Sequence, residues 1–85
     1  MIVVRCLGHI GTSVGKKEVV FPDEKIEASD IVERLRVQSG SQDPGFSRYN
    51  TVVMVEDGEA FVPAGTSKMV EDGAHVVLIP FSHGG

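Results

Sequence analysis

The sequence alternates between short apolar runs and glycine-rich or acidic turns, a pattern that is typical of a small protein built around a sheet. The run IVVRCL (2–7) is rich in β-branched residues and predicts a first strand. The segment GHIGTSVG (8–15) carries three glycines and predicts a loop. KKEVVF (16–21) then predicts a second strand that ends at Pro22, so these two strands are expected to form a hairpin.

One helix is expected in the middle of the chain. Ser29 is expected to act as its N-cap, because its hydroxyl can accept a hydrogen bond from a backbone N–H of the first turn. Ile31, Val32 and Leu35 form an apolar stripe at helical spacing. Gly40 is placed to end the helix in the left-handed conformation.

Three further strands are predicted in the second half of the chain. TVVMVE (51–56) and EAFVP (59–63) flank an Asp-Gly turn, which is a strong signal for a hairpin. A second Asp-Gly turn (72–73) precedes AHVVLIP (74–80). The continuous apolar run of this last strand predicts that it is buried on both faces of the sheet.

The predicted order of elements is β-β-α-β-β-β, and the fold class is α+β. A long loop (39–50), which Phe46 and Tyr49 are expected to anchor, joins the helix to the third strand. A helix lying across a mixed sheet, with the first and last strands side by side, satisfies this order.

The composition is that of a single folded domain spanning residues 1–85. Hydrophobic residues make up 41% and charged residues 24% of the chain, as in ordinary globular proteins. The net charge of -4 disfavours direct binding to nucleic acid and favours partners with basic surfaces. The sequence shows no signal-like leader and no run long enough to cross a bilayer, and the single cysteine excludes an internal disulfide, so we expect a cytoplasmic protein.

The features that could carry catalysis or bind a metal are weak. GHIGTSVGKK resembles a phosphate-binding loop, but its glycine spacing is wrong and Lys17 stands where a magnesium-binding Ser or Thr is needed. The three histidines lie in separate segments without ligand spacing, so no metal site is predicted. Cys6 shares the inner face of its strand with aliphatic residues, which indicates a core residue rather than a nucleophile.

The final segment PFSHGG (80–85) is expected to carry the chemistry. Pro80 prevents helix formation and favours an extended tail, and a reach of about 17 Å is available from Phe81 to Gly85. Because glycine has no Cβ, the last two residues could enter a narrow site on another enzyme, where the terminal carboxyl carbon is open to attack. A folded body that docks at the same time would offset the cost of ordering the tail, about 1–2 kcal/mol per residue.

The predicted strand order and the segment EDGAHVVLIPFSHGG (71–85) resemble the sulfur-carrier family of β-grasp proteins. This ubiquitin-like family includes the small subunit of molybdopterin synthase, the thiamine sulfur carrier and the archaeal ubiquitin-like modifiers. The resemblance covers essentially the whole chain, and its most specific features are the second Asp-Gly turn, the last strand, Pro80 and the terminal Gly84-Gly85. Ala74 and Phe81 depart from the second acidic residue and second proline that family members often carry.

The resemblance implies a carrier and not an enzyme. A ubiquitin-activating-type adenylyltransferase would use ATP in trans to adenylate the carboxylate of Gly85, and sulfur would then displace AMP to form a thiocarboxylate. A sulfur-accepting enzyme, such as the large subunit of molybdopterin synthase, would take up the sulfur. No cofactor would be bound permanently. The residues expected to be recognised in the tail are Pro80, Phe81, Ser82, His83 and Gly84.

Three alternatives are left open by the sequence. The chain could be a protein modifier that is joined through Gly85 to lysines of target proteins, a plain interaction module with an inert tail, or a non-catalytic subunit of a larger enzyme. The long loop after the helix favours the molybdopterin-synthase type over the shorter thiamine type. The acidic surface would suit a basic activating enzyme, and Phe81 with neighbouring strand residues would supply an apolar contact.

Overall fold

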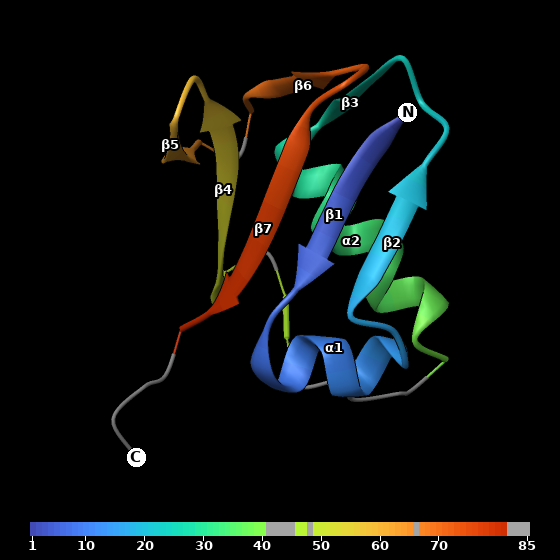
Figure 1. The fold of residues 1–85 in the computed structure, drawn as a ribbon. Helices are drawn as coiled ribbons and strands as arrows, with labels where there is room; N and C mark the ends of the chain where they lie inside the picture. The colour runs from blue at the N-terminus through green and yellow to red at the C-terminus, as the bar shows by residue number, and fades with distance from the viewer. Residues whose placement is uncertain (41–45, 48, 66, 82–85) are drawn as a thin grey trace.

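A mixed sheet forms one layer of the molecule in the computed structural model (Figure 1). The structure describes residues 1–40, 46–47, 49–65 and 67–81. Within these residues the main sheet has five strands in the order β2-β1-β7-β4-β5. The strands are β1 (Ile2–Cys6), β2 (Glu18–Phe21), β4 (Thr51–Asp57), β5 (Ala60–Ala64) and β7 (His75–Pro80). The predicted α+β class is confirmed, as are both predicted hairpins.

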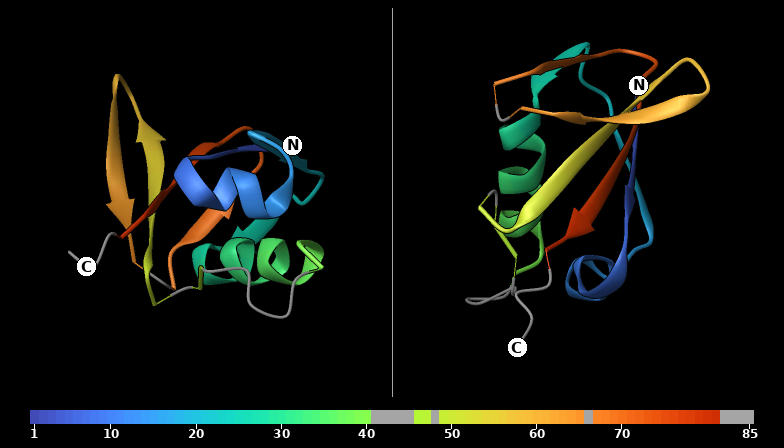
Figure 2. Two further views of the ribbon diagram at one scale, coloured as in Figure 1. Left: turned by 90° about the horizontal axis from the view of Figure 1, so that it is seen from below. Right: turned by 90° about the vertical axis from the view of Figure 1, so that its left-hand side faces the viewer.

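The first and last strands of the chain lie side by side at the centre of the sheet, as predicted. β1 runs parallel to β7, with Val4 opposite Val76, whereas β4 pairs with the other edge of β7 in the antiparallel sense. The prediction that β7 is buried on both faces is wrong. Val76 and Leu78 are buried, but Val77 and Ile79 on the opposite face are only half-buried because no helix covers that face (Figure 2).

The predicted helix is α2 (Ala28–Gln38), and it covers the inner face of the sheet. Its stripe of Ile31, Val32 and Leu35 is fully buried, as expected from the spacing of these residues. Gly40 follows the helix with a φ of 71°, which confirms the predicted left-handed position. Neither helix in the described part of the chain is long and apolar enough to cross a membrane.

The prediction that Ser29 caps this helix is wrong. The residue at the N-cap position is Glu27, and Ser29 lies inside the first turn, where its hydroxyl donates a hydrogen bond to Oε1 of Glu27 at 2.9 Å. The backbone N–H of Ala28 donates to the carbonyl oxygen of Lys68 at 2.8 Å. A tertiary contact therefore satisfies one of the N–H groups at the start of the helix that have no acceptor within the helix.

The glycine-rich segment predicted as a loop forms a second helix, α1 (Gly8–Val14), at one end of the sheet (Figure 1). Ile10 is fully buried in the core, and this burial outweighs the poor helix propensity of the surrounding residues. The glycines have a structural role. A Cβ on Gly11 would lie 2.8 Å from the carbonyl oxygen of Cys6, and Gly15 ends the helix at a φ of 85°.

The sequence patterns did not predict two short strands, β3 (Lys25–Glu27) and β6 (Met69–Glu71). These two strands pair as a separate small sheet. With three residues each, they are too short for an alternating pattern to be recognised. Ile26 and Val70 face each other and are buried, so this small sheet closes one end of the core. In the connection after α2, Phe46 is buried as expected, but Tyr49 is 79% exposed and does not anchor the chain by burial.

The contact at Gly11 predicts an unusual response to alanine. Alanine normally stabilises a helix relative to glycine by about 1 kcal/mol. We expect Gly11→Ala to lower the free energy of unfolding by about 1–3 kcal/mol instead, because the added methyl group meets backbone and not a flexible side chain. Chemical denaturation measures this change, with the exposed Thr12→Ala in the same helix as the control. A Gly11→Ala protein as stable as the parent would contradict the packing of α1 against β1.

Candidate functional site

The end of β7 is the point at which the predicted C-terminal tail leaves the sheet (Figure 1). Pro80 is the last residue of this strand and lies opposite Thr51 of β4. The backbone N–H of Phe81 donates to the carbonyl oxygen of Asn50 at 2.8 Å, so the chain is held by the sheet as far as Phe81. The other predicted tail residues, Ser82, His83, Gly84 and Gly85, lie outside the described residues.

The side chain of Phe81 lies at the rim of a small apolar hollow. It is 54% exposed, and it lines a cavity of about 230 Å³ together with Val32 of α2 and with Val53 and Ala64 of the sheet. An exposed aromatic ring beside the exit of a tail is the kind of group that anchors protein interfaces. The position of Phe81 is therefore compatible with a role in recognition.

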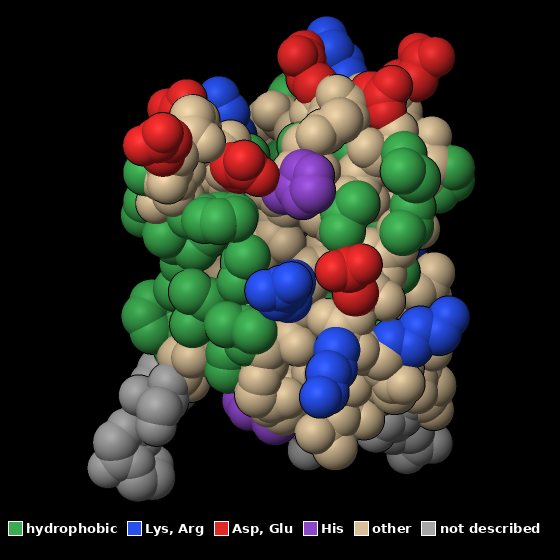
Figure 3. Space-filling model, viewed as in Figure 1, with side chains coloured by type: hydrophobic (Ala, Val, Ile, Leu, Met, Phe, Trp, Pro, Cys, Tyr) green, Lys and Arg blue, Asp and Glu red, His purple; other side chains and the backbone are tan. Residues whose placement is uncertain are grey.

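An apolar surface covers the outer face of β4, β5 and β7, and we call it the sheet patch. Along β4 and β7 its members alternate with core residues: Val53 and Leu78 point inward, whereas their neighbours point outward. The sheet patch consists of Val52, Met54, Phe61, Pro63, Val77 and Ile79. Figure 3 shows hydrophobic side chains gathered over these three strands. A contiguous apolar surface of this kind marks an interaction site.

The sequence carried a signal for this patch that the strand predictions did not use. Every position from Val52 to Val55 is apolar, although only one face of β4 packs against the core. In a strand with one solvated face, apolar and polar residues alternate. A run without alternation therefore indicates a second apolar face of this strand.

Charged side chains are distributed unevenly over the same face (Figure 3). Most of the acidic side chains visible in this view gather at the end of the sheet that is farther from α1. There, Nδ1 of His75 lies 4.0 Å from a carboxylate oxygen of Glu56. The lower half of the face carries basic side chains. The overall charge of -4 is thus not distributed evenly over this face.

The sequence features that could carry catalysis or bind a metal are not brought together in the described part of the chain. Cys6 is 4% exposed, and burial raises the pKa of its thiol, which disfavours the reactive thiolate. It is a core residue, as predicted. The segment that resembles a phosphate-binding loop is occupied by α1. Among the described residues, no three His, Cys, Asp or Glu side chains are grouped so that they could hold a metal ion.

Comparison with known proteins gives matches at the level of structure. The chain matches no protein-family model, and no curated protein sequence is significantly similar to it. The crystal structure of SAMP1 from Haloferax volcanii aligns with a TM-score of 0.66 and 19% identity, over 99% of this chain and 98% of that chain. A crystal structure of small archaeal modifier protein 1 from H. volcanii aligns with a TM-score of 0.62 and 17% identity, over 95% and 97% of the two chains.

These alignments extend over nearly the full length of both chains, so they concern the whole fold and not one shared motif. The similarity agrees with the central pairing of β1 and β7 and with the helix across the inner face. The expected fold resemblance is confirmed. The chain has the β-grasp, ubiquitin-like fold of the small archaeal modifier proteins.

Proposed function

We propose that this chain is a ubiquitin-like carrier whose Gly85 carboxylate is activated by a separate adenylate-forming enzyme and converted to a thiocarboxylate for sulfur donation. The observation that carries the proposal is the position of β7: the central strand of a β-grasp sheet leads directly into Phe81 and then into the sequence SHGG. The hydrogen bond from Phe81 to Asn50 supports this assignment, since it fixes the start of the tail against the body. The protein itself supplies the reacting group and no catalytic residue.

The proposed chemistry has two steps, both on the carboxyl group of Gly85. A carboxylate oxygen attacks the α-phosphorus of ATP held by the partner enzyme, and pyrophosphate leaves. A sulfide-level donor then attacks the carbonyl carbon of the acyl adenylate, AMP leaves, and the product is a thiocarboxylate. No change of oxidation state is required. Glycine suits this role because the absence of a side chain leaves the carbonyl carbon accessible within a narrow site.

Docking of the body would supply the affinity that a short tail lacks. Each tail residue that becomes ordered costs about 1–2 kcal/mol. The sheet patch lies beside the exit of the tail, so an enzyme that covers Phe61 and Val77 could hold the tail in its active site at the same time. We propose that the sheet patch and Phe81 together form this docking surface, used first by the activating enzyme and then by the sulfur acceptor, such as the large subunit of a molybdopterin synthase.

A second fate of the same activated carboxyl group is conjugation to proteins. The two structural neighbours described above are small archaeal modifier proteins, which favours a modifier function. In that case a lysine amine of a target protein attacks the Gly85 adenylate, or a thioester derived from it, and an isopeptide bond forms. The two fates share the activation step and differ only in the final nucleophile.

Mass spectrometry of the protein purified from its native cells tests the proposed function. We expect an intact chain that ends at Gly85, of which a fraction carries sulfur in place of one carboxyl oxygen. Expression of Gly85-deleted protein in the same cells is the control and should give no such species. A Gly-Gly remnant on lysines of other proteins would identify the modifier function. Absence of both products from cells that contain the activating enzyme would contradict the proposal.

The docking surface makes a separate prediction. Phe61→Ala should weaken binding to the activating enzyme by about tenfold to thirtyfold, because a large exposed aromatic side chain is lost from the proposed interface. Val20→Ala is the matched control, since Val20 is similarly exposed on the same face but lies on the far strand β2. Isothermal titration calorimetry with each variant measures the difference. Equal affinities for the two variants would exclude the sheet patch as the docking surface.

A further inference from the structure

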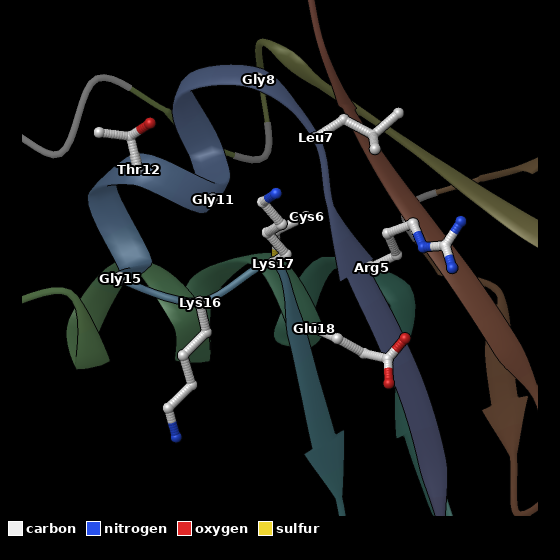
Figure 4. A pocket seen from close by; sticks show the side chains of 10 residues that line it. All are labelled: Arg5, Cys6, Leu7, Gly8, Gly11, Thr12, Gly15, Lys16, Lys17 and Glu18. Atoms are coloured by element: carbon white, nitrogen blue, oxygen red, sulfur yellow. The ribbon is translucent and has the colours of Figure 1, made fainter.

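An open hollow of about 740 Å³ lies between α1 and the beginning of β2, outside the sheet patch (Figure 4). Lys17 lies across it, in front of Cys6, with its side chain directed toward α1. Arg5 lies at the rim beside β7, and Lys16 projects away from the hollow on its other side. The volume is sufficient for several side chains of a bound segment, since ligand sites commonly measure about 300–1,000 Å³.

The hollow concentrates positive charge on an acidic protein. Arg5, Lys16 and Lys17 are three of the eight Lys and Arg residues of the chain, whose net charge is -4. Glu18 is the one carboxylate among the lining residues. The local charge is therefore opposite in sign to that of the whole molecule, and it favours an anionic ligand at this position.

These three cations, like Lys68 next to β6, differ in their pairing from three other basic residues. Arg34, Arg36 and Lys25 each form an ion pair with a carboxylate. Within the described residues, neither Arg5 nor the two lysines has a carboxylate oxygen within 4.0 Å, although Glu18 lies opposite Arg5 in the register of β1 and β2. Their hydrogen-bonding capacity is thus available to an external anion.

The hollow lies next to β7, the strand that precedes the proposed tail. The backbone N–H of Leu7 donates to the carbonyl oxygen of Leu78 at 3.1 Å, and a Cβ on Gly8 would lie 3.2 Å from the ring of Pro80. Arg5 lies opposite Val77, a member of the sheet patch. A partner that covers the sheet patch would therefore reach Arg5 and the hollow without a change in the fold.

We propose that this hollow, lined by Arg5, Lys16 and Lys17, binds an acidic segment of the protein that docks on the sheet patch. The inference rests on the proposed function and deepens it, because it specifies a partner surface that is apolar beside the tail and rich in Asp or Glu next to that apolar part. Carboxylates on the partner would steer the encounter and fix its orientation, while the apolar contact would supply most of the affinity.

A protein segment fits the hollow better than a nucleic acid does. The charge of -4 repels a phosphate backbone over the rest of the surface, and three cations are fewer than nucleic-acid binding generally uses. The adjoining sheet patch is apolar and would gain nothing from contact with phosphates. A few carboxylates placed beside an apolar surface match both parts of the face.

An NMR titration with a model ligand tests the inference. Acetylated, amidated hexaglutamate is added to the isotope-labelled full chain at low ionic strength. We expect saturable changes in amide chemical shift that are confined to the segments 5–8 and 11–18. The affinity for the peptide should fall about fivefold to tenfold in Lys17→Glu. Lys68→Glu is the control, because it changes the net charge equally beside β6, at the opposite end of the sheet. This control should bind as the parent does.

Three results would overturn the inference. Equal weakening by the two variants would mean that the peptide responds only to net charge. Equal saturable shifts with inorganic phosphate at the same concentration would make the hollow a site for small anions. Loss of peptide binding in the Gly85-deleted chain would place the site at the tail. Binding by the deleted chain, combined with absence of thiocarboxylate and conjugates in cells, would instead support the inference and contradict only the proposed function.

Discussion

The parallel pairing of β1 with β7 is the constraint on which the rest of the structure depends. It brings segments from near the two ends of the sequence together at the centre of the sheet. Closing so long a loop lowers the conformational entropy of the chain, and other interactions must offset this cost before the pairing is stable. The offset comes from burial: Val4, Val76 and Leu78 are at most 1% exposed beneath α2, and a fully buried side chain of this size contributes about 1.5–3 kcal/mol.

The same pairing determines where the segment after Phe81 leaves the body of the protein. β7 is held on both edges, by β1 and by β4, and it is the last strand of the chain. Whatever follows Phe81 therefore starts from a defined position and direction. A terminal carboxylate carried on an edge strand or on a frayed helix would lack this rigid base, and its delivery to a second protein would cost more conformational entropy.

Much of the fold could be predicted from local patterns, because the spacing of apolar residues identifies the buried faces of the strands and of the main helix. The alternation at Ile2 and Val4 and the helical spacing of Ile31 and Leu35 correspond directly to the core. Helix α1 could not be predicted in this way, because its glycines lower the helix propensity of the segment. The helix is explained by tertiary contacts, namely the burial of Ile10 and the close approach of Gly11 to Cys6. The start of α2 was misplaced for the same reason, because Ala28 is satisfied by Lys68, a residue forty positions away in sequence.

The residues of the proposed tail can be read from the sequence, whereas the surfaces around the end of β7 cannot. Proline followed by a short polar segment and two glycines is visible in the sequence, and so is the density of apolar residues in the last strand. The sheet patch depends on the register of three strands, which brings Phe61 and Val77 to the same face as Met54. The cationic hollow depends on α1, which was expected to be a loop. The sequence therefore indicated an acidic docking surface, whereas the structure places Arg5, Lys16 and Lys17 around the hollow beside α1.

The central claim is that the carboxyl group of Gly85 is the reacting group of this molecule. ATP–pyrophosphate exchange by the purified activating enzyme measures adenylation of that carboxyl directly. The chain ending at Gly85 should support exchange, and a chain with one alanine appended after Gly85 should support none, because the added methyl group and the displaced carboxylate no longer fit the same site. Equal exchange with both chains would contradict the account.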